Sequence, residues 1–393
     1  MEQLVQSNLG AAFPALAVTI LQRGEALLNA AWGWIDPETQ TLPTRTDSLF
    51  DLASVSKMFN VTAFLSLASE GRVALDAPLV DFVPEFGQSG PRPTDGGQDP
   101  HSKVMLPVSD DGRGKRVDPT KVTLRHLATH TSGLAPWRAV YQAAGPAPAP
   151  PDQPEPVSRQ ARWARGLDMI CSSPFVGEPG DRVRYSDLGM MLLGEVVTRL
   201  HDASRDLDAA IHDRVLAPLG LKSVTYNPVR TGRPQTTTVP TEMDADWRKR
   251  RPWGEVHDEN ACGLGGIAGH AGLFGTARDV AAFGQAWLDE DARLGITSRL
   301  LREAVTEQSC TGAARHGLGW VLPTDDPLSI GSVLSPRSYG HTGFTGTSLW
   351  VDPARALVVA CLSNRVYYGR QNEMIVAFRR AFHELLAQAL GET

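Results

Sequence analysis

Ser54 and Lys57 lie three residues apart at the start of an apolar stretch. A serine hydroxyl is a weak nucleophile at neutral pH and needs a neighbouring base, which a lysine provides when its surroundings shift or hold its charge. On a helix, positions i and i+3 face the same side. The first turn also points free amides and the positive end of the helix dipole at whatever is bound to Ser54. The pair therefore predicts a nucleophile and its partner. Taken alone, however, the four-residue pattern from Ser54 to Lys57 is also consistent with a solvated lysine at the start of a helix.

Two further motifs carry groups of the kind that such a nucleophile needs. Tyr185 and Asp187 follow a Gly/Pro turn and precede an apolar helical pattern, so the tyrosine hydroxyl can point into a cleft and transfer a proton. The segment 340–346, GHTGFTG, precedes an apolar strand. Its glycines permit close backbone approach to a ligand, and the amide of Phe344 is predicted to be a second oxyanion donor beside the amide of Ser54. Taken singly, a packing tyrosine and a structural glycine-rich edge are the ordinary interpretations.

The order and separation of these motifs resemble those of the penicillin-recognising serine hydrolases, which include class C β-lactamases, DD-peptidases and related esterases. Ser54 and Lys57 match the S-x-x-K motif, and Tyr185 and Asp187 match Y-x-N with Asp in place of Asn. The segment 341–343 matches K-T-G with His in place of Lys. The likeness extends to segments 122–134, 265–276 and 364–365, and so covers about residues 10–385.

The resemblance implies a role for each matched residue. Ser54 would form an acyl-enzyme, Lys57 and Tyr185 would share the general-base step, and the amides of Ser54 and Phe344 would hold the oxyanion. The sequence leaves open whether Lys57 or Tyr185 takes the first proton, because a coupled pair titrates as a unit. The substrate would contact the side chains or backbone of four residues, namely Asp187, His341, Thr342 and Gly343.

Two departures from the family motifs bear on the substrate. No lysine follows Lys249 to replace the lysine of K-T-G. His341 has an ordinary pKa of about 6.5, so it offers a hydrogen bond more readily than a fixed charge at neutral pH. Asp187 adds negative charge where Asn is usual. Both changes weaken recognition of an anionic β-lactam.

Composition excludes several classes of function. The net charge is -6 with a pI of about 5.9, which gives no electrostatic reason to expect nucleic acid or an anionic membrane as partner. The cysteines at 171, 262, 310 and 361 lack the spacing of a zinc site or a disulfide framework, so we expect no metal and no cofactor. The N-terminus lacks a basic signal-peptide region, and no apolar run approaches the ~20 residues that span a bilayer. We therefore expect a cytoplasmic protein, and the oligomeric state stays open.

Apolar patterns predict the elements that position these residues. They indicate a hairpin from 15–22 and 26–34, a buried helix over 55–69, further helices over 157–171, 188–201, 205–215 and 276–289, short apolar strands over 317–322, 347–352 and 356–363, and a final helix over 371–390. This order predicts an α/β (α+β) fold in which an antiparallel sheet is formed by the N- and C-terminal segments, flanked by helices, with a large inserted helical region. The expected sheet domain is discontinuous, 1–60 and 305–393, and the expected helical domain is 61–304.

Several secondary expectations complete the interpretation. The Gly- and Pro-rich segments 86–119 and 144–156 are predicted surface excursions, and the second is a candidate lid. His126 and His130 are expected to bond backbone near residues 131–133, and His270 is a candidate cleft residue. The basic run 248–251 is predicted to be a solvated face.

The leading functional hypothesis is a carboxylesterase acting on small, weakly charged acyl esters through Ser54. The alternatives are an amidase or D-aminopeptidase on peptidoglycan fragments, similar to an N-acetylmuramoyl-L-alanine amidase, and a weak β-lactamase. A catalytically silent binding module is the alternative outside enzymes. The presence of Ser54, Lys57 and Tyr185 together argues against the last.

Overall fold

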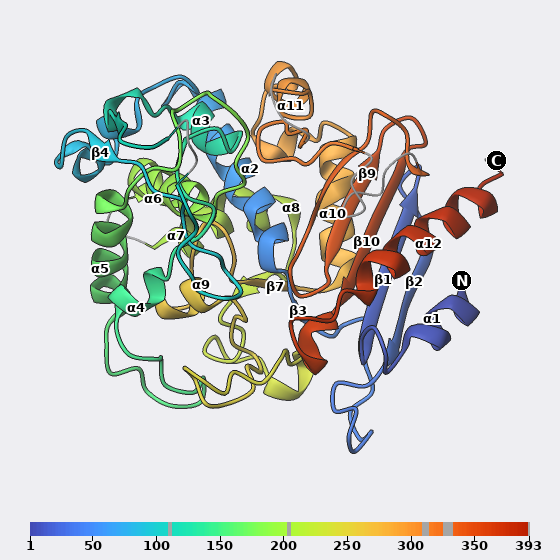
Figure 1. Ribbon diagram of the computed structural model, residues 1–393. Helices are drawn as coiled ribbons and strands as arrows, with labels where there is room; N and C mark the ends of the chain where they lie inside the picture. Colours follow the sequence, from blue (N-terminus) through green and yellow to red (C-terminus); the bar gives the residue numbers. More distant parts are fainter. Residues whose placement is uncertain (109–111, 203–205, 309–313, 325–332, 392–393) are drawn as a thin grey trace.

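A five-stranded antiparallel sheet joins the two ends of the chain (Figure 1). The computed structural model describes residues 1–108, 112–202, 206–308, 314–324 and 333–391. The strand order is β2 (Glu25–Gly33), β1 (Ala15–Gln22), β10 (Leu357–Ser363), β9 (Ser348–Asp352) and β8 (Tyr339–Thr342). β1 pairs with β10 in a register that places Leu16 opposite Ser363. The predicted fold class, with a sheet built from both termini, is confirmed.

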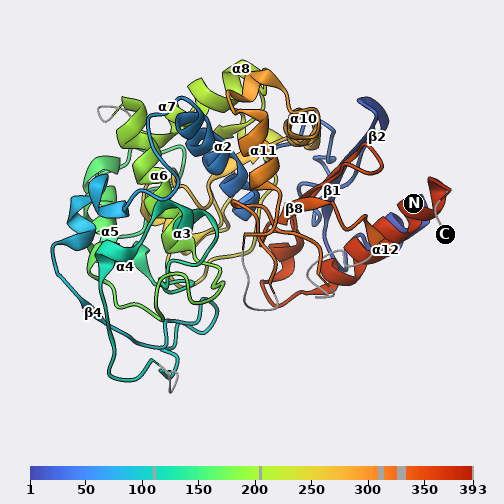
Figure 2. The same cartoon turned by 90° about the horizontal axis from the view of Figure 1, so that it is seen from above.

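Helices cover both faces of the sheet, and alternating side chains of its strands pack against them. Leu357, Val359 and Cys361 of β10 face α12 (Met374–Ala389) and α1 (Glu2–Asn8) in one apolar cluster. Val358, Ala360 and Leu362 belong to the larger core on the opposite face, where α10 (Ala277–Leu288) packs. This period of two is what a strand buried on both faces requires. Figure 2 shows the sheet between these helices.

The remaining helices form a separate helical region beside the sheet (Figure 1). They are α2 (Ser56–Ser69), α3 (Leu124–Ala128), α4 (Val140–Ala144), α5 (Arg159–Ser172), α6 (Asp187–Asp202), α7 (Leu207–Ile211), α8 (Ala217–Leu219), α9 (Glu259–Gly263) and α11 (Ser298–Ala304). Two small sheets connect them, β3 (Phe50–Asp51), β7 (Leu273–Gly275) and β6 (Thr225–Tyr226) in one, and β4 (Arg92–Pro93) with β5 (Arg116–Val117) in the other.

The helix α2 is the central element of the fold. Every residue from Ser56 to Leu67 is buried, as its nearly uniform apolar pattern predicts. It packs against α6, the helix that begins at Asp187. The two motifs that start these helices are thereby brought to one place.

Some expectations about elements need correction or stay untested. The run 317–322 is not a strand, because Gly317 and Gly319 (φ 78°) bend the chain and only Val321 bridges to Gly340. α10 falls inside 61–304 yet packs on the sheet, and the exact domain boundaries stay a prediction. Cys171, Cys262 and Cys361 are buried free thiols, and Cys310 lies outside the described residues. Within those residues, no helix is long and apolar enough to cross a membrane.

Candidate active site

The hydroxyl of Ser54 lies in a short 3-10 turn (Ala53–Val55) that runs directly into α2. Ala53 has a left-handed backbone (φ 46°), and its amide donates to Asp51 Oδ1 at 2.9 Å, which fixes the bend before the serine. Lys57 lies one turn later and donates to Ser54 Oγ at 2.8 Å. The predicted pair is therefore in direct hydrogen-bond contact, and Lys57 is fully buried.

The ammonium of Lys57 has an acceptor for each of its three protons. Besides Ser54 Oγ, these are Asp187 Oδ1 at 2.8 Å and the carbonyl of His270 at 3.0 Å. Burial disfavours the charged form, but the Asp187 carboxylate and Tyr185 outweigh it and raise the pKa of Lys57 above its usual value. Asp187, at the motif position where Asn is usual, thus acts as the counter-ion of the lysine.

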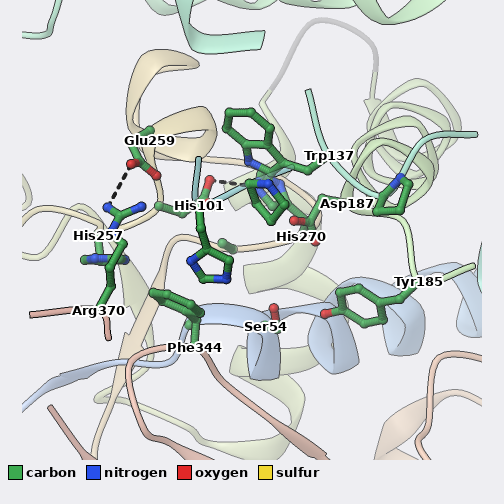
Figure 3. A pocket seen from close by; sticks show the side chains of 15 residues that line it. Ser54, His101, Trp137, Tyr185, Asp187, His257, Glu259, His270, Phe344 and Arg370 are labelled. Atoms are coloured by element: carbon green, nitrogen blue, oxygen red, sulfur yellow. Dashed lines mark hydrogen bonds and ion pairs between the residues drawn. The ribbon is translucent and has the colours of Figure 1, made fainter. Parts of the chain in front are cut away.

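The hydroxyl of Tyr185 points toward Ser54 (Figure 3). Its ring lies 4.9 Å from Lys57 Nζ and packs against His130, with ring centroids 4.5 Å apart. Burial raises the pKa of Tyr185, and the charge of Lys57 opposes this rise only in part. The resting pair is therefore a charged lysine and a protonated tyrosine. His130 Nδ1 accepts a hydrogen bond from the backbone amide of Ser186 at 3.0 Å, so it bonds the backbone just before α6 and not the 131–133 turn.

The turn after β8 packs closely against the segment before Ser54. Thr345 Oγ1 donates to the Asp51 carbonyl at 2.8 Å, and Thr347 Oγ1 donates to the Leu52 carbonyl at 2.9 Å. A Cβ on Gly343 would lie 2.1 Å from Thr347 Oγ1, so only glycine fits there. The amide of Phe344 donates to no acceptor among the described residues, which leaves it free for a ligand.

The imidazole of His341 is in the tautomer that leaves Nε2 as a hydrogen-bond acceptor. Its Nδ1 lies 2.8 Å from the carbonyl of Thr342, which can only accept, so Nδ1 carries the proton. Nε2 is then a lone pair, buried and without a partner in the described chain. Burial first, and then the charge of Lys57, lower the pKa of His341 to about 3. This imidazole is neutral at physiological pH and does not replace the cation of a K-T-G lysine.

A polar wall opposite the 343–347 turn was not recognised in the sequence. His257 stacks on the ring of Phe344 at 5.5 Å and pairs with Glu242, while Arg370 bridges Glu242 and Glu259. The buried Arg248 stabilises the backbone behind this wall. It pairs with Asp244 Oδ2 at 2.7 Å and donates to the carbonyls of Val256 and His257. The predicted solvated basic face is therefore wrong for three of the four residues, and only Lys249 is exposed. Asp244 compensates the buried charge of Arg248, Glu255 pairs with Arg250 at 2.7 Å, and Arg251 donates to the carbonyls of Thr241 and Tyr367.

His270, a candidate cleft residue from the sequence, lines the cleft, and its Nε2 lies 2.8 Å from Asp258 Oδ1. Together with Asp187 these groups offer ligand atoms within 4.8 Å of one another. The ammonium of Lys57 already pairs with Asp187, and Asp258 already pairs with His270 and the amide of Ala261 at 2.7 Å. Both carboxylates of the cluster therefore already have partners in the protein.

Two cavities meet at Ser54, and both are also lined by Tyr185, Phe344, His101 and Arg370. One has a volume of about 210 Å³ and has Trp137 and Pro136 among its lining residues. Figure 3 shows Trp137 in this cavity. The other has a volume of about 630 Å³ and extends past His341 toward α12.

One of the two predicted surface excursions lies over these cavities. In segment 86–119, His101 reaches the Phe344 ring at 5.6 Å, and Lys103 lies over Trp137 at 4.3 Å. Segment 144–156 is bound instead by Arg162, Arg230 and Arg250, and none of its residues lines either cavity at Ser54.

Comparison with known proteins identifies relatives and proteins of the same fold. A putative D-alanyl-D-alanine carboxypeptidase of Escherichia coli K12 is 28% identical over 93% of this chain and 81% of its own length. The octameric penicillin-binding protein homologue from Pyrococcus abyssi shares the fold, with 20% identity, a TM-score of 0.68 and coverage of 100% of this chain and 77% of that one. The hydrolase EstCE1, which has promiscuous acyltransferase activity, gives 18% identity, a TM-score of 0.65 and coverage of 96% and 97%.

The model of the Beta-lactamase family matches residues 1–381, nearly the whole chain. The predicted resemblance is confirmed, and the chain belongs to the Beta-lactamase family of serine hydrolases.

Proposed function

We propose that this chain is a carboxylic-ester hydrolase that forms an acyl-enzyme on Ser54. The observation that carries the proposal is the Ser54 hydroxyl, 2.8 Å from the fully buried Lys57, at the meeting point of two cavities. A nucleophile hydrogen-bonded to a group that accepts its proton once that group has been deprotonated, with a free backbone amide nearby, is the arrangement that acyl transfer requires. The neutral His341 argues against penicillin as the preferred substrate.

In the proposed reaction, Ser54 Oγ attacks the ester carbonyl carbon and its proton passes to the Lys57–Tyr185 pair. The amides of Ser54 and Phe344 stabilise the negative oxygen of the tetrahedral intermediate. The pair returns the proton to the alcohol oxygen as the bond to the alcohol breaks. A water molecule then attacks the acyl carbon and gives one proton to the same pair. The pair returns this proton to Ser54 Oγ as the bond between Oγ and the acyl carbon breaks and the acid is released.

Asp187 sets the pH range of this cycle. Because it holds Lys57 in the charged form, the pair is a base only after it loses one proton. The proposal therefore includes a rise of activity with pH.

Amide hydrolysis is the second candidate. The Escherichia coli relative carries the name of a carboxypeptidase, which favours amide bonds in D-amino-acid peptides or peptidoglycan fragments. Weak β-lactamase activity ranks third, since the same nucleophile attacks a strained amide without the cation at position 341.

One experiment ranks these candidates. Turnover of a short-chain p-nitrophenyl ester, a muramyl-peptide amide and a chromogenic cephalosporin is compared for the wild type and Ser54→Ala. We expect the ester to have the highest kcat/KM, and Ser54→Ala to lose at least ~10³-fold in kcat together with labelling by a serine-directed phosphonate. Ester turnover that survives in Ser54→Ala would sink the mechanism, and a preference for the amide by several orders of magnitude would replace the ester by the amide as substrate.

A further inference from the structure

The smaller cavity at Ser54 borders an aromatic cage that already holds an ammonium group. The cage consists of the rings of Trp137 and Tyr141 and the carboxylate of Glu259. Lys103 Nζ lies 4.3 Å from the centre of the Trp137 ring and 5.9 Å from that of the Tyr141 ring. It also pairs with Glu259 Oε1 at 3.3 Å. Aromatic faces attract cations and a neighbouring carboxylate adds to this attraction, so the cage has the composition that selects an ammonium group.

Buried contacts fix the cage in place. Trp137 is 4% exposed and Tyr141 is 7% exposed, and the centres of their rings lie 6.4 Å apart. Asn260 follows Glu259 on α9 and is fully buried. Its Oδ1 accepts from the Tyr141 amide at 3.0 Å, and its Nδ2 donates to the Arg138 carbonyl at 2.9 Å. The helix that carries the carboxylate is thus bonded to the segment that carries both rings, and the cage is preorganised.

The cage is open to the catalytic cavity. Two of its three groups, Trp137 and Glu259, also line the smaller cavity (Figure 3). Carboxylates outnumber guanidinium groups in the lining of this cavity, with Asp187, Asp258 and Glu259 against Arg370. A substrate group that enters the cage from the cavity therefore does not cross a basic surface.

Lys103 reaches the cage from a turn that lies outside the helices and strands. Segment 97–106 is closed by a hydrogen bond from the Leu106 amide to the Gly97 carbonyl at 2.9 Å. Lys103 has a left-handed backbone (φ 61°), which is uncommon for a residue with a side chain. Its side chain is 31% exposed. The ammonium of Lys103 is thus a tethered ligand in contact with water, and a second ammonium group can displace it.

A comparison with Arg92 separates this cage from a structural cation. Arg92 also lies over two rings, those of Phe86 and Phe175, at 4.2 Å and 4.4 Å. It is 2% exposed, donates to backbone carbonyls and lines neither cavity at the nucleophile. The cage around Lys103 differs because it contains a carboxylate and shares its walls with the catalytic cavity.

We propose that Trp137, Tyr141 and Glu259 form a subsite for an ammonium group of the substrate, which Lys103 fills until the substrate binds. The proposal rests on the proposed function and narrows its substrates to esters with a positively charged amino group on one side of the scissile bond. The substrate ammonium takes the place of Lys103 Nζ between the same rings and carboxylate. Because Lys103 is tethered, it competes with every such substrate and lowers the apparent affinity of the cage for the cation.

Two matched pairs of esters test for recognition of the charge. The first pair is acetylcholine and 3,3-dimethylbutyl acetate, in which the charge lies on the alcohol side. The second pair is p-nitrophenyl 4-(trimethylammonio)butanoate and p-nitrophenyl 5,5-dimethylhexanoate, in which the charge lies on the acyl side. In one of the two pairs, Lys103→Gln should raise the ratio of kcat/KM for the cationic over the neutral ester by about five- to thirtyfold relative to the wild type. A lysine that only fastens segment 97–106 would change both esters of a pair alike.

Second substitutions separate the cage from a general change in charge. Trp137→Leu removes a ring without changing the charge, and Glu259→Gln removes the carboxylate. Each should abolish the raised ratio when it is added to Lys103→Gln, and a ratio within one protein cancels a general loss of activity.

Lys115→Gln is the matched control. Lys115 belongs to the same segment 86–119, is exposed and lines neither cavity at Ser54, so this variant should keep the wild-type ratio. Three results would each overturn the proposal. They are a ratio in Lys103→Gln that equals the wild type in both pairs, a rise that persists in a folded double variant, and an equal rise in Lys115→Gln.

A binding measurement keeps this outcome separate from failure of the proposed function. Calorimetric titration of the Ser54→Ala/Lys103→Gln protein with choline and with 3,3-dimethylbutanol requires no turnover. Choline binding that is lost when Trp137→Leu is added supports the cage even if esters are not hydrolysed. Absence of choline binding, or equally tight binding of the neutral alcohol, counts against the cage even if neutral esters are hydrolysed.

Discussion

Replacing Asp187 by Asn tests the electrostatic account of the active site most directly. The change keeps the size of the side chain and restores the residue usual in the Y-x-N motif, but it removes the counter-ion 2.8 Å from Lys57 Nζ. Asp187 raises the pKa of Lys57 and also that of Tyr185. Its removal should lower both, so the sign of the effect does not depend on which group takes the first proton.

The size of the shift follows from the distance and the burial. Two unit charges about 3 Å apart attract by roughly 6 kcal/mol at an effective dielectric constant of about 20. Asp187 is 17% exposed, and water screens part of this attraction. Carboxylates at such distances shift the pKa of a partner by about 1–3 units, or about 1.4–4 kcal/mol. The limb on which kcat/KM rises with pH should therefore move down by about 1–3 pH units in Asp187→Asn.

The measurement is the pH profile of kcat/KM for a neutral p-nitrophenyl ester, between about pH 5 and 10, for both proteins. Asp76→Asn is the control, because Asp76 also forms an ion pair, with Arg125 at 2.7 Å, but on the surface, and its limb should coincide with the wild type. A limb that stays within about 0.3 pH units of the wild type, or moves upward, would refute the role given to Asp187.

Two further predictions concern the 343–347 turn and the pH dependence of stability. Gly343→Ala should lower kcat/KM by about 10²–10³-fold, because its Cβ would meet Thr347 Oγ1 at 2.1 Å and displace the Phe344 amide, while the circular dichroism spectrum should show that the fold is retained. Gly189→Ala is the control and should keep full activity, because its Cβ meets nothing closer than 3.7 Å. Burial lowers the pKa of His383 to about 4, so its contribution to stability is present above about pH 6.5 and is lost as the pH falls toward 4. Urea unfolding at pH 7 and pH 5 should show about 2 kcal/mol less loss for His383→Asn than for the wild type, and equal losses would contradict the assignment.

Local patterns predicted the elements that are defined by their own residues. The all-round apolar helix α2, the β1–β2 hairpin and α10 follow from periodicity and from caps such as Thr276, whose hydroxyl accepts from the Asp279 amide at 3.2 Å. The contact between Ser54 and Lys57 follows from their spacing on α2.

Features that depend on contacts between distant segments were missed. Nothing near Arg370 in the sequence indicates that it bridges Glu242 and Glu259, and nothing near His101 indicates that it reaches the ring of Phe344. For Arg248 the sequence did contain an indication of burial, namely Asp244, because a carboxylate four residues earlier can pair with a buried basic residue. A run of basic residues indicates a solvated face only where no nearby carboxylate can pair with them.

The pairing of β1 with β10 has a consequence for folding during synthesis on the ribosome. The ribosome releases β1 and β2 first, but their partner strand ends at Ser363. At a translation rate of about 5–20 residues per second, β10 is synthesised roughly 20–70 s after the β1–β2 hairpin. A two-stranded ribbon is at best marginally stable alone, and its open edge is a template for wrong pairing. We expect the nascent chain to depend on protection of this edge, for example by a chaperone, until β10 has been synthesised.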